Sequence, residues 1–383
     1  MRKNVKQQLA LRVLSTAALM AMVSSIATAA FADTYDLNKG SVDILAEGGE
    51  QRITQWEDKD NNLCVKDGEG KEIRNREDKD IILTTKDKAT GETKTTSNTV
   101  TIDAKDGNTA NVTLQDVDIE QSGSYWDSDP APIEIKGDGD TNLELNGDNT
   151  VLSGKSKHAG IEKADVNGTG TLTIKDDKND DGSVKKKDKN GNAVGGDTGT
   201  LLAGGCGRGA GIGGGSYHGD YYLEDKKDEV STSNITITGG KITASGGSSG
   251  GAGIGGGVHG DASNIRIEGN ADVTAFGSLG AAIGSGFESA GNSDITITDH
   301  ATVEAASEEG CGIGGSEGDC GIVTVTISGH ASVHAEALDY AAAIGSQGSS
   351  ATVNINDHAD VTAVSTGVAI GTGFGTDGIG SHG

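Results

Sequence analysis

The chain has 383 residues, a formal net charge of −26, 62 glycines, two prolines and only 3% aromatic residues. Few large side chains are available to fill an ordinary globular core, and the acidic charge argues against nucleic acid or anionic membranes as partners. High charge with few aromatics is also typical of disorder, but regular patterns of Ile, Val and Thr in the second half argue against it.

Residues 1–32 have the features of a secretory signal peptide. A basic start precedes an apolar run, Val13–Ile26, and small residues follow at 30–32, where cleavage is expected. The run is short and interrupted by serine and threonine, which disfavours the alternative of a membrane anchor. Cleavage near Asp33 removes four basic residues and no acidic ones, so the charge becomes −26 − 4 = −30. We expect an exported, acidic protein, secreted or associated with the cell surface or wall, that attracts divalent cations and basic partners.

Residues 33–98 are the least patterned part of the mature chain, and their charged runs WEDKDNN and REDKD are typical of loops. A stacked β-structure needs its first layer covered, so we interpret this segment as an N-terminal cap with irregular first coils. Residues 99–232 alternate apolar and polar residues in several tracts and contain an acidic insertion, which predicts irregular β-coils.

The acidic insertion contains the stretch DKNDDGSVKKKD, which resembles the calcium loop of dockerin modules. Asp177, Asn179 and Asp181 stand at positions 1, 3 and 5 of such a loop, with Gly182 at position 6 and Asp188 at position 12. The stretch departs from that pattern in three ways: it occurs only once, no helices are expected on either side of it, and position 12 is Asp where an EF-hand has Glu. An acidic turn inserted between two coils is the alternative to a calcium site.

Residues 233–383 contain a repeat of about 30 residues. The second apolar residue of each aligned strand is Ile237, Ile267, Ile297, Ile327 or Ile355, so the intervals are 30, 30, 30 and 28 residues. A glycine-rich stretch follows each strand, and its central Ile254, Ile283, Ile313, Ile344 or Ile370 comes 15 to 17 residues later. Repetition at this period is typical of a solenoid.

The alternation I-T-I-T predicts a half-buried strand, and a second short strand follows each first one. With the glycine stretch as a third, three strands per coil define a single-stranded parallel β-helix, an all-β fold. The sequence GAGIGGG contains Gly209, Gly211 and Gly214 in the G-x-G-x-x-G spacing of a dinucleotide loop. Its repetition indicates instead that glycine allows tight turns and close approach of neighbouring coils.

An exported chain with the stretches YDLNKGSVDI, APIEIKGDGDTNLELNGDNTV, HAGIEK and GTLTIKDD before tandem GAGIGGG coils resembles the carbohydrate-binding β-helix domains of bacterial extracellular proteins. That family has a pectate-lyase-like fold, and the resemblance covers essentially the whole mature chain. It implies a right-handed helix, polysaccharide binding at a cell surface, calcium held in the coils in many members, and a scaffold shared with lyases.

Sugar binding of this kind commonly uses an aromatic face. The candidates are Tyr125 and Trp126 in GSYWDSD, and Tyr217, Tyr221 and Tyr222 in SYHGDYYLED. Both segments have the composition of loops, which carry function on rigid scaffolds. Alternatively, these aromatics cover the apolar core.

Lyases of this fold use calcium-binding aspartates with a basic residue as proton acceptor. Arg266 is the one Arg on an aligned strand, and Asp294 and Asp299 lie in the next coil. No neighbouring coil supplies a second base or a dense acidic cleft. We therefore expect no catalytic activity, with a calcium-dependent polysaccharide lyase as an alternative.

Histidines occur at two kinds of repeated position. The triplets His218-Gly219-Asp220 and His259-Gly260-Asp261 are expected one coil apart, either as a metal pair or, more simply, as polar turns. His300, His330 and His358 each follow the aligned Ile by three residues, so they are expected to stack as a structural ladder on the outer turn, with Asn270 in register.

The four cysteines are Cys64, Cys206, Cys311 and Cys320. Cys311 and Cys320 are the favoured disulfide candidate because they close a short loop within one repeat, while four unpaired thiols are the alternative.

The chain stops at GTDGIGSHG without a polar covering segment, which predicts that the natural protein continues, for instance into a wall-anchoring region. The sequence as a whole indicates a carbohydrate-binding or adhesive surface module, stabilised by calcium and without membrane insertion after signal cleavage. The rival class is a structural, acidic stalk of a larger surface protein.

Overall fold

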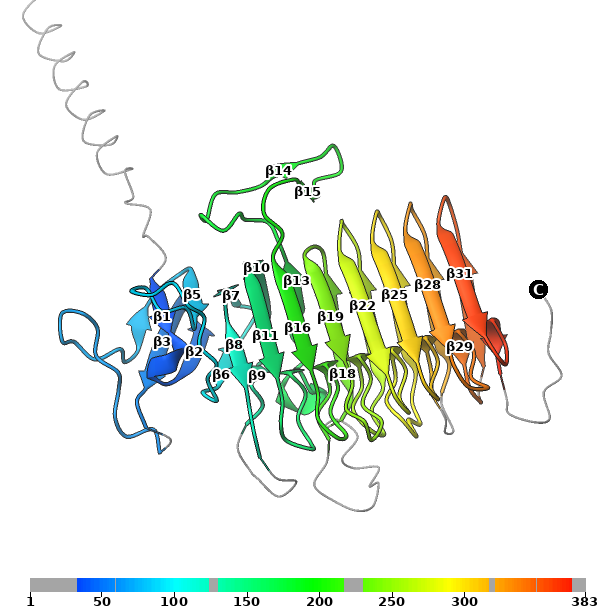
Figure 1. The fold of residues 1–383 in the computed structure, drawn as a ribbon, viewed down its shortest axis with the longest axis horizontal. Coiled ribbons are helices and arrows are strands. Elements are labelled where there is room, and N and C mark those ends of the chain that lie inside the picture. Colours follow the sequence, from blue (N-terminus) through cyan, green and yellow to red (C-terminus); the bar gives the residue numbers. More distant parts are fainter. Residues whose placement is uncertain are drawn as a thin grey trace, which may run out of the picture.

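The computed structural model describes residues 33–58, 60–123, 130–216, 230–316, 321–348 and 350–373. The predicted signal peptide, residues 1–32, lies outside this part of the chain. Within the described ranges, no helix has the length and apolar character needed to cross a bilayer. The described chain is a right-handed parallel β-helix, an elongated stack of β-coils (Figure 1).

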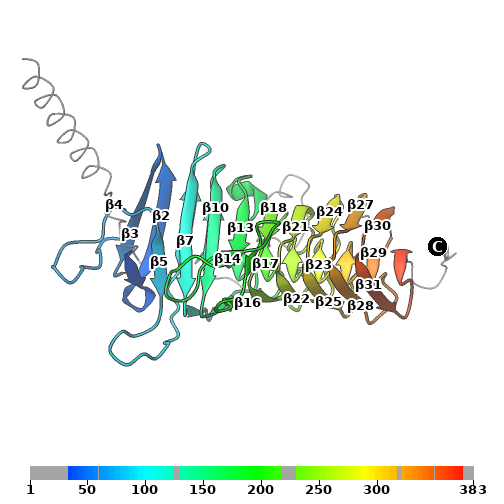
Figure 2. The same ribbon diagram turned by 90° about the horizontal axis from the view of Figure 1, so that it is seen from above.

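Three long sheets run along the stack, and from β7 onward each coil contributes one strand to each sheet (Figures 1 and 2). The first sheet consists, in spatial order, of β1 (Thr34–Asp36), β5 (Ile81–Thr84), β7 (Thr109–Gln115), β10 (Asp140–Asn146), β13 (Leu172–Lys175), β18 (Thr232–Ile237), β21 (Ala262–Ile267), β24 (Ser293–Ile297), β27 (Val323–Ile327) and β30 (Ala351–Ile355).

The second sheet consists of β8 (Asp118–Glu120), β11 (Asp148–Leu152), β16 (Thr200–Gly204), β19 (Lys241–Ser245), β22 (Asp272–Gly277), β25 (Thr302–Ser307), β28 (Ser332–Ala337) and β31 (Asp360–Ser365). The third consists of β4 (Arg76–Glu77), β3 (Glu50–Trp56), β2 (Ser41–Glu47), β6 (Val100–Ala104), β9 (Ile133–Lys136), β12 (Ile161–Glu162), β17 (Ile212–Gly213), β20 (Ile254–Gly255), β23 (Ile283–Gly284), β26 (Ile313–Gly314), β29 (Ile344–Ser346) and β32 (Ile370–Thr372). The described ranges also contain two 3-10 turns, η1 (Leu37–Lys39) and η2 (Asp165–Asn167).

The predicted alternation places the aliphatic residues inside the helix. On β24, Ile295 and Ile297 are fully buried, while Thr296 between them faces outward and is half-buried. Parallel pairing keeps this register from coil to coil, so Ile267 lies beside Ile297, which lies beside Ile327. Each buried Ile contributes about 1.5–3 kcal/mol, and the column of these residues forms the centre of the molecule.

From β17 to β32, a glycine follows the Ile of each strand of the third sheet, and at Gly284 the spacing of the coils requires it. Gly284 has φ +137°, and a Cβ built there would lie 1.9 Å from the carbonyl oxygen of Gly314 in the next coil. A side chain would therefore collide with the neighbouring backbone. This confirms that the repeated GIG element is architectural and not a phosphate-binding loop.

The segment predicted as an N-terminal cap also contributes coil strands. Strands β1 and β5 pair in parallel within the first sheet, and β2 pairs in parallel with β6 of the third. At the N-terminal end of the third sheet, β3 lies antiparallel to β2 over its whole length (Figure 2). Residues 33–98 thus contain regular coil structure, and their role as a cap stays a prediction.

The acidic insertion forms a hairpin that projects from the stack (Figure 1). Its strands β14 (Lys186–Lys187) and β15 (Ala193–Val194) pair in antiparallel fashion. At the base of the insertion, the Lys185 ammonium contacts the Asp176 carboxylate at 2.5 Å, with both side chains more than nine-tenths buried. The amide of Asn270 donates to the Ala193 carbonyl, which ties the hairpin to a later coil.

Candidate functional site

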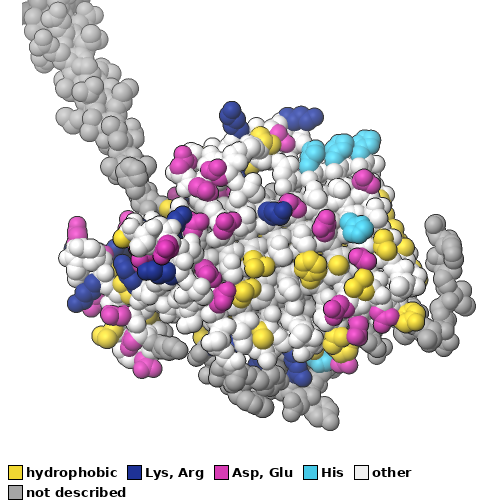
Figure 3. Space-filling model, in the orientation of Figure 1, with side chains coloured by type: hydrophobic (Ala, Val, Ile, Leu, Met, Phe, Trp, Pro, Cys, Tyr) yellow, Lys and Arg dark blue, Asp and Glu magenta, His cyan; other side chains and the backbone are white. Residues whose placement is uncertain are grey.

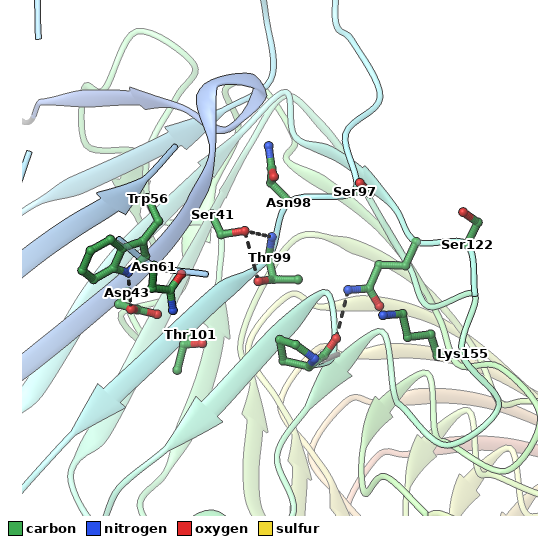
Figure 4. Close-up of a pocket in the computed structure, with 12 residues that line it drawn as sticks. Ser41, Asp43, Trp56, Asn61, Ser97, Asn98, Thr99, Thr101, Ser122 and Lys155 are labelled. Atoms are coloured by element: carbon green, nitrogen blue, oxygen red, sulfur yellow. Dashed lines mark hydrogen bonds between the residues drawn. The ribbon is translucent and has the colours of Figure 1, made fainter. Parts of the chain in front are cut away.

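A cavity of about 250 Å³ opens on the outer face of the first coils (Figure 4). It is lined by polar side chains and one indole: Ser41, Asp43, Trp56, Asn61, Ser97, Asn98, Thr99, Thr101, Gln121, Ser122, Pro130 and Lys155. We call these residues the Trp56 groove. They come from β2, β3 and β6 and from the turns between coils, so only the folded stack brings them together.

Trp56 is the last residue of β3, and antiparallel pairing places it beside Ser41. Its indole Nε1 donates a hydrogen bond to Asp43 Oδ2 at 2.5 Å, and the Arg74 guanidinium lies 5.3 Å from the ring centroid. This bond and the cation–π contact hold the ring in one orientation while it stays partly exposed. The indole is therefore preorganised for a ligand.

The floor of the groove is the outward face of the third sheet. Asp43 on β2 and Thr101 on β6 are direct neighbours in the parallel register, and both point away from the core. Beside them, Ser41 Oγ accepts a hydrogen bond from the Thr99 backbone N–H at 3.0 Å. Hydroxyl, amide and carboxylate groups thus lie in one layer next to the indole, where they can donate and accept hydrogen bonds.

Gln121 forms part of the far wall of the groove. Its side chain is 8% exposed; the amide Nε2 donates to the Pro130 carbonyl at 3.0 Å, but Oε1 has no hydrogen-bond partner among the described residues. A buried acceptor without a partner costs about 1–3 kcal/mol, which a ligand donor would recover. Lys155, 3% exposed, lies on the same side, opposite Trp56 and Asp43 (Figure 4).

This groove was not predicted from the sequence. The predicted aromatic ligand contacts, Tyr125, Trp126, Tyr217, Tyr221 and Tyr222, all lie outside the described residues, so their contact with ligand stays a prediction. Ser122 and Pro130, which flank the first of these segments in the sequence, do line the groove. The sequence signal for the groove was Trp56 in the run QWEDKDNN, but the many charged residues of that run favoured its interpretation as a loop.

The four predicted calcium ligands take part in separate contacts. Asp177 forms ion pairs with Lys175 and Lys187, and the Asn179 amide donates to Ser183 Oγ. The Asp181 carboxylate accepts from the Ser183 N–H. Asp188 lies in the next turn, where it accepts from the N–H groups of Asn190 and Asn192.

No group of three or more Asp, Glu, His or Cys in the described ranges could hold a metal ion. Calcium binding by this loop stays a prediction that these contacts do not support.

The second His-Gly-Asp triplet belongs to a polar turn. His259 Nδ1 lies 3.3 Å from the Glu288 carbonyl oxygen, and the buried Asp261 carboxylate accepts from Ser289 Oγ. His218 and Asp220 lie outside the described residues, so the predicted pairing of the two triplets is not tested.

The histidine ladder is confirmed. The rings of His300 and His330 are stacked with centroids 5.2 Å apart, and those of His330 and His358 with centroids 5.1 Å apart. Pairing of Ile267 with Ile297 puts Asn270 in register with His300, as expected.

Arg266, the candidate base of a lyase, donates from Nε and Nη2 to Glu268 Oε2 on its own coil. Asp299 accepts from the Gly269 N–H through Oδ2, and Asp294 is exposed. These contacts assign Arg266 to an ion pair and Asp299 to a turn.

Neither Cys64 nor Cys206 is an activated thiol. Burial raises the pKa of the Cys64 and Cys206 thiols, so both are held in the protonated, unreactive form. Neither forms a disulfide with another described residue. Cys311 is buried, and its predicted partner Cys320 lies outside the described residues, so that pairing stays a prediction.

The fold defines the class of this molecule, a parallel β-helix protein built from tandem coils. Residues 235–258, 265–287 and 295–317 match the family model described as Beta helix repeat, and these three matches fall on successive coils of the stack. Comparisons with curated proteins and with solved structures gave no significant match.

Proposed function

We propose that the protein is a non-catalytic, glycan-binding β-helix module that acts outside the cell, and that the Trp56 groove is its binding site. The observation that carries the proposal is a fixed, partly exposed indole in a cavity whose other walls are mostly hydroxyl, amide and carboxylate groups. Binding sites combine apolar surface with a few placed polar groups, and this groove has both.

A sugar ring matches this chemistry in two ways. The C–H face of a pyranose is apolar and can stack on the indole, while its ring of hydroxyls needs many donors and acceptors around its edge. Gln121 Oε1 supplies one acceptor that is buried and has no partner among the described residues. The volume of about 250 Å³ lies slightly below the roughly 300–1,000 Å³ of most ligand pockets, which favours a single sugar unit or the end of a glycan.

Calorimetric titration with a panel of soluble plant and host glycans tests the proposal, first with the unchanged protein and then with Trp56→Ala and Asn61→Ala. Loss of an aromatic contact costs about 0.5–1.5 kcal/mol beyond the lost area, so Trp56→Ala should weaken binding by about tenfold or more. Phe276→Ala is the matched control because Phe276 is 46% exposed on β22, outside the groove. The Phe276→Ala protein should bind the glycan with the same affinity as the unchanged protein.

Unchanged glycan affinity in a folded Trp56→Ala protein would refute the groove as the site. The same titrations with and without calcium test whether calcium bound at Asp177 and Asp181 supports binding. If no glycan in the panel binds, the structural stalk is the better proposal, which the rigid, elongated stack itself favours (Figure 1). Release of unsaturated sugar ends would instead support the lyase alternative.

A further inference from the structure

A row of histidine side chains lies along one edge of the molecule, at the turns that lead into β25, β28 and β31 (Figure 3). We propose that this ladder, His300, His330 and His358, binds a divalent transition-metal ion such as Zn²⁺, Ni²⁺ or Cu²⁺ between neighbouring imidazoles. The site is separate from the Trp56 groove and independent of the proposed glycan binding.

The stack of coils fixes the three residues at equal spacing. The backbone N–H of His300 donates to the Gly269 carbonyl at 2.9 Å, and that of His358 donates to the Gly329 carbonyl at 2.9 Å. The Asp299 carbonyl accepts the N–H of His330 in the same way. Because these bonds belong to the coil ladder, the three Cα positions are preorganised and a ligand does not have to order them.

The side chains are exposed and their rings are close to parallel. The planes of His300 and His330 differ by 23° and those of His330 and His358 by 16°, with centroids 5.2 and 5.1 Å apart. An imidazole binds a metal through a nitrogen lone pair that lies in the ring plane, so neighbouring rings must turn out of the stack to share one ion. Zn²⁺ lies about 2.0–2.1 Å from an imidazole nitrogen, and two nitrogens on one tetrahedral ion are about 3.4 Å apart. Rotation about the χ1 and χ2 torsions, which solvent leaves free, brings two such nitrogens together without moving the backbone.

The ligand chemistry selects the class of ion. Neutral imidazole suits Zn²⁺, Ni²⁺ and Cu²⁺, whereas calcium requires oxygen ligands. The nearby carboxylates have other roles: Asp299 Oδ2 and Asp357 Oδ2 accept the N–H groups of Gly269 and Gly329. Two imidazoles and water therefore complete the site, which makes it weaker than a closed four-ligand site.

His330 belongs to both neighbouring pairs, and this gives the proposal a distinct signature. His330→Gln removes both pairs, whereas His300→Gln and His358→Gln each leave one pair intact. Loss of a group that merely orients a metal ligand costs 10–100-fold in affinity, so loss of a ligand from both pairs should cost at least about tenfold. The matched control is His334→Gln, because His334 is exposed on β28 and its neighbours across the sheet are Glu304 and Thr362.

The experiment is calorimetric titration of the full chain, without a histidine tag, with Zn²⁺ and Ni²⁺, together with electron paramagnetic resonance of bound Cu²⁺. We expect the unchanged protein and His334→Gln to bind equally and to show nitrogen coordination of copper. His300→Gln and His358→Gln should bind more weakly by only a small factor, and His330→Gln at least about tenfold more weakly. Equal binding by folded His330→Gln, or an equal loss in His334→Gln, would overturn the proposal in favour of non-specific surface binding.

Discussion

Lys163 is a buried cation that the fold does not neutralise. Its side chain is 1% exposed, and Nζ has no hydrogen-bond partner among the described residues. Burial lowers the pKa of this ammonium, and the charge of Asp165 only partly opposes the shift. Because the folded state holds the proton less tightly than the unfolded chain, the group costs stability whenever it is charged.

Lys163→Met should therefore stabilise the protein by about 1–3 kcal/mol at neutral pH, the usual cost of a buried polar group without a partner. In the unchanged protein, the free energy of unfolding should rise as the pH increases from the lowered pKa of folded Lys163 towards the ordinary lysine pKa of about 10.4. Between these two pKa values the unfolded chain binds more protons than the folded protein, so a rise in pH favours the folded state. Denaturant melts of both proteins between neutral pH and pH 10 measure this slope, which the variant should lose.

Lys241→Met is the control for that comparison, because the Lys241 side chain is 61% exposed. Its free energy of unfolding should change by less than about 0.5 kcal/mol, and its pH slope should match that of the unchanged protein. A Lys163→Met protein less stable than the unchanged one would show that the ammonium has a partner, for instance a bound water, that supports it.

From β17 to β32, each strand of the third sheet has a glycine at the same position. At Gly284, φ +137° and the contact with the Gly314 carbonyl combine backbone strain with a collision. Gly284→Ala should destabilise the protein by about 2–6 kcal/mol, as the sum of about 1–3 kcal/mol of strain and about 1–3 kcal/mol of overpacking. Denaturant unfolding measures the change.

Gly182→Ala separates the two causes. Gly182 has φ +80° in the inserted hairpin, and a Cβ there would meet nothing within 4 Å. This variant should lose only the strain, about 1–2 kcal/mol. Equal losses in both variants would mean that the neighbouring coil moves aside at Gly284 and that close approach does not require glycine.

The coils were predictable because two periods coincide in the sequence. Alternation places Ile295 and Ile297 inside, and the interval of 30 residues stacks each on its equivalent, which also predicts the stacking of His300 on His330. The Trp56 groove has no such period. Trp56 meets Asp43 through an antiparallel pair, and stacking of irregular coils places Gln121 in the far wall of the same groove. Both placements depend on where each turn ends. Single positions of this kind leave no repeated signal.

The two ends of the stack differ in how well their strands are covered, so we expect local unfolding to be easier at one end than at the other. At the N-terminal end of the third sheet, β3 covers β2, and Ile53 and Val42 are almost completely buried. At the other end, β30, β31 and β32 are the edge strands of their sheets, and Ile355, Val364 and Ile370 are 40–45% exposed. In a solenoid each coil is stabilised mainly by its neighbours, so a coil with one neighbour opens most easily.

Hydrogen exchange should therefore show a gradient of amide protection that falls from β24 and β27 to β30. The interior amides lie between coils with fully buried Ile297 and Ile327, whereas β30 pairs, among the described strands, with β27 on one side only. Exchange followed by mass spectrometry at two protein concentrations measures the gradient. Uniform protection up to β30 would contradict it. If that protection also grew with concentration, another molecule would be covering the exposed edge strands, because such edges pair readily with a second chain.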